Sequence, residues 1–219
     1  MRGVDVSALY SIEEDGSKFY EKGSSTSKDM LQILKDHGVN WIRLRVWNDP
    51  NNANYVPMTN YGWCDIWKAV AISKRAKALG MKVLLDLHYS DTWADPGYQL
   101  RPKAWDDCSG ISDLASRAAA FTKDCLTNMK NYGGGLPDMI QIGNEINSGI
   151  MISASDYTGT DLWCGISTSN FQTVMKACIS AVRSYSSSIS THLRFFSGIR
   201  ESIHTSKDSS GLIISSGVM

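Results

Sequence analysis

An amide and a carboxylate follow directly on an apolar run in the segment QIGNEINSG, residues 141–149. Residues 139–143 are typical of a buried strand, and Asn144 and Glu145 come at its end. A Glu at such a position can act as a general acid, while a neighbouring Asn can hydrogen-bond a substrate hydroxyl. Alternation along a strand places these two side chains on opposite faces, so they share one site only if the chain bends there. A structural interpretation stays open, in which Glu145 pairs with Arg43 or Arg45.

A second group of polar and aromatic side chains lies in LDLHYSDTWADP, residues 85–96. His88 ends a predicted strand, and Asp91 and Trp93 follow on the loop. These side chains could contact a substrate. The alternative is that His88 is a satisfied strand-end histidine, and that Asp91 and Asp95 only form the turn before the proline.

Tryptophans gather in the same parts of the chain. Five of the seven Trp lie at or after predicted strand ends: Trp47, Trp63, Trp93, Trp105 and Trp163. Flat rings beside Asp, Asn and Arg are what a sugar-binding cleft requires, because ring faces stack on apolar C–H patches and polar groups bind hydroxyls. A local cluster of packed loop side chains is the alternative. Trp41 and Trp67 fall inside predicted elements, and we expect both to be core residues.

Helices and strands alternate along most of the chain. We predict helices at residues 26–37, 65–79, 111–132 and 168–186, and strands at residues 2–7, 40–47, 81–88 and 137–145. This order indicates a parallel sheet with helical crossovers. The loops before strands are short and contain Gly, whereas the loops after strands are long, which is typical of a (β/α)8 TIM barrel. A doubly wound sheet is the rival, but no glycine-rich phosphate loop follows the first strand.

The predicted strands have one apolar and one polar face. Ile42, Leu44 and Val46 alternate with Arg43 and Arg45, and the other strands place Asp5, Asp86, His88 and Gln141 on the polar face. An open sheet covered by helices on both sides would need two apolar faces. A barrel can direct the polar face into its lumen.

Composition excludes several classes of protein. The 219 residues carry a formal net charge of zero, which gives no support to a nucleic-acid or anionic-membrane partner. No run of 18 apolar residues indicates a membrane span, and the start MRGVDVSALY has no apolar segment typical of a secretory signal. We therefore expect no membrane association and no cofactor.

The five cysteines show no C-x-x-C spacing, so we predict no zinc site and no other metal. Cys125 and Cys178 lie within predicted helices and are expected to be buried. Cys64, Cys108 and Cys164 lie on three loops, and two of them could form a disulfide in an oxidising compartment.

The alternation of predicted helices and strands is less clear near the C-terminus. Residues 192–196 could form a fifth strand and residues 211–218 a weak sixth, and the segment is rich in Ser. A complete barrel typically needs about 250 residues. We therefore expect a barrel truncated after five or six β/α units, with residues 1–190 as its N-terminal part and residues 191–219 as a divergent or incomplete tail.

Four strings in order, GVDVS, IRLRVWNDP, LDLHYSDTWADP and IGNEI, resemble the arabinogalactan endo-β-1,4-galactanases of glycoside hydrolase family 53. The resemblance runs from residue 2 to about residue 167. It implies a TIM barrel, secretion of the full-length protein, and retaining hydrolysis of the β-1,4-galactan side chains of pectin. It also implies Glu145 as acid/base, Asn144 on the substrate 2-hydroxyl, and Arg45, His88, Asp91 and Trp93 lining the sugar subsites, with Trp47 a further candidate for substrate binding.

The resemblance also implies a second catalytic Glu, the nucleophile, at the end of a seventh strand. The only Glu after Glu145 is Glu201, and its surroundings GIRESIHTS do not resemble a strand end. Two alternatives therefore stay open: a non-catalytic, galactan-binding or vestigial partial barrel, and a barrel glycosidase acting on β-mannans or β-glucans instead.

Overall fold

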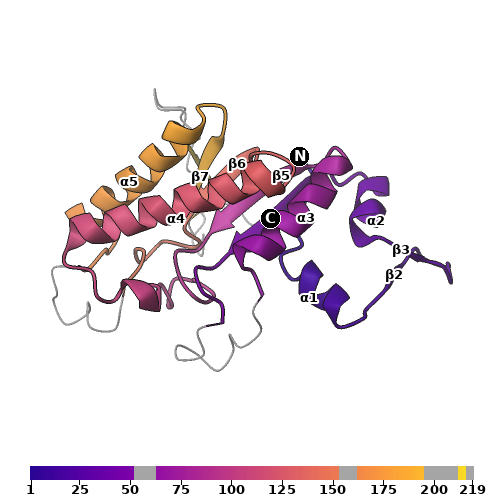
Figure 1. Ribbon diagram of the computed structural model, residues 1–219, viewed down its shortest axis with the longest axis horizontal. Coiled ribbons are helices and arrows are strands. Elements are labelled where there is room, and N and C mark those ends of the chain that lie inside the picture. The colour runs from indigo at the N-terminus through magenta and orange to yellow at the C-terminus, as the bar shows by residue number, and fades with distance from the viewer. Residues whose placement is uncertain (52–62, 153–161, 195–211, 216–219) are drawn as a thin grey trace.

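The computed structural model describes residues 1–51, 63–152, 162–194 and 212–215, the last of these for the backbone alone. Its centre is a six-stranded sheet in which every neighbouring pair is parallel, in the order β1-β4-β5-β6-β7-β8 (Figure 1). The strands are β1 Gly3–Asp5, β4 Trp41–Val46, β5 Lys82–Leu87, β6 Met139–Ile142, β7 Ser190–Arg194 and β8 Leu212–Ser215. Spatial order follows chain order without reversal, which is the winding of a barrel and not of a doubly wound sheet.

Helices connect the successive strands from β1 to β7. They are α1 Leu9–Glu14, α2 Met30–Asp36, α3 Ile66–Ala78, α4 Ile111–Tyr132 and α5 Ser169–Tyr185, and a short antiparallel hairpin of β2 Phe19–Tyr20 and β3 Ser27–Lys28 precedes α2. The helices α3, α4 and α5 lie side by side over one face of the sheet (Figure 1). The prediction of an α/β fold built from β/α units is confirmed. Within the described residues, no helix combines the length and hydropathy needed to cross a bilayer.

The alternation predicted along the strands is confirmed by burial. The apolar face packs beneath the helices, and its members are 0–1% exposed: Ile42, Leu44, Val46, Val83, Leu85, Leu87, Ile140 and Ile142. Cys125 and Cys178 join this core from α4 and α5, as expected. None of the five cysteines forms a disulfide, so no two of the loop cysteines Cys64, Cys108 and Cys164 are joined.

Three sequence expectations need correction. The helix predicted from residue 26 begins at Met30, because Asp29 is its N-cap and accepts hydrogen bonds from the amides of Leu31 and Gln32. The strand predicted to reach residue 145 ends at Ile142. Trp67 is not a core residue: it is 57% exposed on α3, and its ring lies 5.7 Å from that of the exposed Tyr132.

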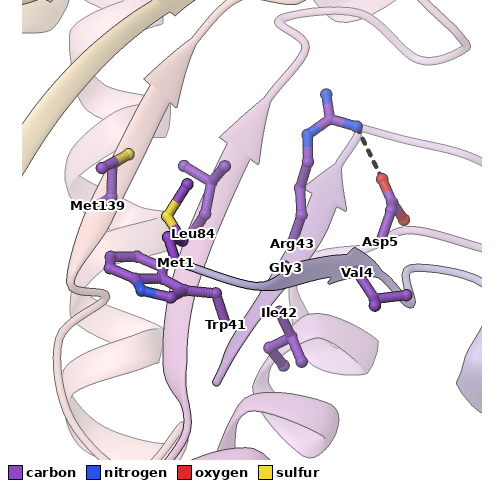
Figure 2. Close-up of a pocket in the computed structure, with 9 residues that line it drawn as sticks. All are labelled: Met1, Gly3, Val4, Asp5, Trp41, Ile42, Arg43, Leu84 and Met139. Atoms are coloured by element: carbon purple, nitrogen blue, oxygen red, sulfur yellow. Dashed lines mark hydrogen bonds and ion pairs between the residues drawn. The ribbon is translucent and has the colours of Figure 1, made fainter. Parts of the chain in front are cut away.

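A cavity of about 250 Å³ lies on the polar side of the sheet, at the amino ends of β1, β4 and β6 (Figure 2). Met1, Trp41, Leu84 and Met139 give it an apolar lining. Arg43 and Asp5, which form an ion pair on the same strands, also line this cavity (Figure 2).

Candidate active site

Arg43 of β4 is the centre of a buried polar cluster. Its Nη1 donates to Asp5 Oδ2 at 2.7 Å, and its Nη2 donates to Asp86 Oδ2 at 2.5 Å and to Asn144 Oδ1 at 2.9 Å. Burial opposes the charge of Arg43, but the Asp86 and Asp5 carboxylates outweigh it and raise the pKa of the guanidinium. The cluster links the strands β1, β4 and β5 to Asn144, the second residue after β6.

Asp5 provides the exposed side of this cluster. Burial would raise the pKa of its carboxyl, but Arg45, the Ser7 hydroxyl and Arg43 together lower it. Ser7 Oγ donates to Asp5 Oδ1 at 2.6 Å and in turn accepts from the Arg45 amide at 2.8 Å. Asp5 is therefore ionised and held in place, so its role is to support the arginines.

The chain leaves β6 through a left-handed turn. Gly143 has a φ of +77° and Glu145 a φ of +50°. A Cβ on Gly143 would lie 2.6 Å from Ile146 Cγ2 and 3.0 Å from Ile150 Cδ1, so glycine is required for space as well as for conformation. The bend that a shared site for Asn144 and Glu145 requires is therefore present. Because of it, the two side chains need not point to opposite faces as they would in a regular strand.

The turn is held by Asn144 and by Gln99. Asn144 is 1% exposed, and its Nδ2 donates to Ala94 O at 2.8 Å. Gln99 Nε2 donates to the carbonyl oxygens of Asn144 at 2.7 Å and Glu145 at 3.3 Å. Sequence reasoning missed Gln99, because a glutamine in the middle of a long loop carries no periodic or motif signal.

Glu145 itself is half-buried, and among the described residues no hydrogen bond or ion pair engages its carboxylate. Its charge is close enough to Arg43 to contribute to the raised pKa of that guanidinium. Arg43 is committed to Asp5 and Asp86, and Arg45 lies against Trp93. Among the described residues, Glu145 therefore forms no ion pair with Arg43 or Arg45.

His88 and Trp47 lie beneath the surface of the site. His88 is 1% exposed and Trp47 8%. Trp47 Nε1 donates to His88 Nδ1 at 3.2 Å, the Ala94 amide donates to the same nitrogen at 3.1 Å, and His88 Nε2 lies 2.9 Å from Asp86 Oδ2. Both residues were predicted to bind substrate, and that stays a prediction; their hydrogen bonds support the loop that begins after β5.

Trp93 is the aromatic surface of the site. It is 42% exposed, its ring edge meets His88 at a centroid distance of 5.7 Å, and the Arg45 guanidinium carbon lies 4.4 Å from its ring centroid. Arg45 therefore covers Trp93 and fixes its orientation through a cation–π contact. The exposed part of the indole is available for stacking against a ligand.

Asp91 is buried and binds backbone amides of two loops. It is 2% exposed, and its carboxylate accepts from the Asp49 amide at 2.9 Å and from the Lys103 amide at 2.8 Å. It therefore ties the loop after β4 to the loop after β5. Of the other loop tryptophans, Trp163 is 41% exposed and Trp105 is buried.

The arrangement suits acid–base chemistry on a neutral, ring-bearing ligand: a carboxylate, an oriented amide and an aromatic surface lie at the carboxyl ends of the strands. Among the described residues, no group of three His, Cys, Asp or Glu side chains could hold a metal ion. Glu201 lies outside the described residues.

Comparisons with known proteins identify the family of the chain. A family model described as glycosyl hydrolase family 53 matches residues 1–207. The chain is similar to an endo-beta-1,4-galactanase from Bacillus subtilis (strain 168), at 41% identity over 151 residues, covering 68% of this chain and 34% of the relative.

Two solved structures are similar to the fold. One is the catalytic domain of a family 53 protein from Ignisphaera aggregans, at 40% identity and a TM-score of 0.74, covering 89% of this chain and 51% of that one. The other is a fungal beta-1,4-galactanase, at 30% identity and a TM-score of 0.74, covering 90% and 54%. The chain spans about half or less of the length of the relatives it matches.

Proposed function

The chain belongs to glycosyl hydrolase family 53, and on that basis we propose that it carries the acid/base half of an endo-β-1,4-galactanase site, with Glu145 as the acid/base. Residues 1–190 would be the N-terminal part of the barrel and residues 191–219 a divergent or incomplete tail, from which β7 and β8 still contribute strands to the sheet. The B. subtilis relative is named for this activity, which supports β-1,4-galactan as the substrate class.

One observation carries the proposal: Glu145 is held by a left-handed turn beside a buried Asn144, with a carboxylate that is committed to no other described residue. In the proposed reaction the protonated Glu145 donates to the glycosidic oxygen as the bond to the leaving sugar breaks. Its carboxylate then accepts a proton from water as the intermediate is hydrolysed.

The retaining mechanism needs a second carboxyl about 5–5.5 Å from the first to attack the anomeric carbon. Asp5 and Asp86 are the carboxylates within the buried polar cluster, and both accept hydrogen bonds from Arg43. Neither is suited to be a nucleophile, so the proposal requires this group from outside the described residues. The same fact favours the second candidate function, in which the chain binds galactan without cleaving it.

The test is to incubate the purified chain with linear β-1,4-galactan, β-mannan and β-glucan, and to measure new reducing ends and, separately, polysaccharide affinity. Hydrolysis of galactan alone supports the proposal, and the Glu145→Gln variant should then lose about 10²–10⁴-fold in rate. The matched control is Glu14→Gln, which alters an exposed Glu on α1.

Retained hydrolysis in the Glu145→Gln variant would overturn the catalytic assignment. Galactan affinity without hydrolysis, unchanged by that substitution, would favour the binding function. Neither affinity nor hydrolysis for any of the three polysaccharides would remove both candidates.

A further inference from the structure

Five hydrogen bonds close into a ring around the floor of the site. His88 Nε2 joins Asp86 Oδ2, Asp86 Oδ2 accepts from Arg43, Arg43 donates to Asn144 Oδ1, Asn144 Nδ2 donates to Ala94 O, and the Ala94 amide donates back to His88 Nδ1. The side chains of this ring are 0–7% exposed. The ring is therefore a single buried unit, in which Arg43 Nε and Asp86 Oδ1 are the atoms without a hydrogen-bond partner.

The chemistry of the donors determines the state of His88. The Ala94 amide and the Trp47 indole can only donate, and both point at His88 Nδ1, at 3.1 and 3.2 Å. That nitrogen must present its lone pair. The ring proton is therefore on Nε2, where it faces Asp86 Oδ2 at 2.9 Å.

We propose that His88 and Asp86 are positioning residues: the ring holds His88 as its neutral Nε2–H tautomer and so fixes the orientation of the Asn144 amide. The role assigned to Asn144 rests on the proposed function. His88 is thereby excluded as a proton donor or acceptor in the reaction, and Asp86 acts only through Arg43 and His88.

The charged groups around His88 are consistent with a neutral ring. Asp86 on β5 is negative, but it is shared with Arg43 on β4, which also holds Asp5 and lies near Glu145. A second proton on His88 would place an N–H group against the Ala94 and Trp47 donors. Protonation would therefore break two hydrogen bonds in a site where they cannot be replaced by water.

The ring also determines which hydrogen-bonding groups of Asn144 are occupied. Asn144 Oδ1 accepts from Arg43 and, at 3.2 Å, from Gln141 Nε2. One Nδ2 hydrogen binds Ala94 O. The second Nδ2 hydrogen has no partner among the described residues, so the group of this buried amide that is left for a further hydrogen bond is a donor and not an acceptor.

The deciding experiment is NMR of the chain labelled with ¹³C and ¹⁵N at histidine, without substrate. Absence of the His88 signals from the His88→Gln spectrum assigns them among the four histidines. We expect one Nε2–H signal and an Nδ1 chemical shift typical of an unprotonated, hydrogen-bond-accepting nitrogen. An Nδ1–H tautomer would overturn the proposal.

The His88→Gln variant and a second variant, His88→Asn, separate positioning from simple packing. His88→Asn keeps an acceptor near the Nδ1 position, whereas His88→Gln keeps a donor near the Nε2 position. The indole N–H signal of Trp47 should therefore stay hydrogen-bonded in the Asn variant and lose its partner in the Gln variant. Equal changes in both variants would mean that His88 only fills space. These readouts need no hydrolysis, so they stand or fall separately from the proposed function.

Discussion

Substituting Gly143 by Ala should destabilise the chain far more than the added methyl group would suggest. Gly143 has a φ of +77°, and its Cβ would lie 2.6 Å from Ile146 Cγ2 and 3.0 Å from Ile150 Cδ1. Two independent costs therefore apply, one from the left-handed backbone and one from the collision. Both isoleucines are fully buried, so neither can move into solvent to relieve it.

The magnitude follows from these two costs. A left-handed conformation costs an L-residue about 1–2 kcal/mol. Overpacking a filled core costs about 1–3 kcal/mol. The free energy of unfolding should therefore fall by about 2–5 kcal/mol, which corresponds to a fall in Tm of about 4–20 °C at this chain length.

The assay is urea and thermal unfolding followed by circular dichroism. The matched control is Gly16→Ala: Gly16 has a φ of +81°, but a Cβ there meets no atom within 4 Å. This control should lose only the backbone cost, about 1–2 kcal/mol. In the Gly143→Ala, Ile146→Ala double variant the collision with Ile146 is removed, so the two losses should fall short of additivity by about 1–3 kcal/mol. Equal losses at the two glycines, or full additivity, would refute the reasoning.

Three other predictions concern the same cluster and the thiols. Gln99→Ala removes the donor to two buried carbonyls of the turn and should cost about 1–3 kcal/mol in urea unfolding; a loss below about 0.5 kcal/mol would contradict this role. The pKa of Asp5 is lowered in the fold, so its charge contributes stability above the unfolded-state pKa of about 4, and this stability is lost as pH falls through the lower folded-state value. Asp5→Asn should therefore flatten the decline of the urea midpoint below about pH 4, and an unchanged slope would argue against the ion pair with Arg43. Burial raises the pKa of the Cys64 thiol to about 11 and also raises that of Cys108, but Cys108 is the least buried cysteine, so Ellman's reagent at about pH 8 should find one accessible thiol in the native chain and all five after denaturation.

Local patterns in the sequence were sufficient to predict the architecture. Strand alternation identified the core face and also the polar face on which Asp5, Arg43 and Asp86 meet, because period-two patterning is set by burial on one side of a sheet. The helix at residues 111–132 has the predicted bounds. Helix α2 begins at Met30 and not at the predicted residue 26, because Asp29 is its N-cap.

Contacts between distant loops could not be predicted. Gln99 lies 45 residues from Asn144, and Asp91 42 residues from Asp49, and no periodicity connects either pair. The sequence showed that a bend was needed near Asn144 but not which backbone conformation would supply it. Burial of Trp67 was predicted from its helical position, yet position on a helix face does not determine what covers that face.

The closed ring constrains which substitutions this protein can accept during evolution. Its members are His88, Asp86, Arg43, Asn144 and Ala94. Each bond has a direction, and each direction is set by its neighbours, so altering the side chain of His88, Asp86, Arg43 or Asn144 leaves two other members with mismatched partners, whereas Ala94 takes part only through its backbone. We expect family sequences to retain the set together or to exchange several members in one lineage, with single exchanges rare. Libraries that vary these positions one at a time should yield few folded clones, whereas paired exchanges that keep every donor facing an acceptor should restore them.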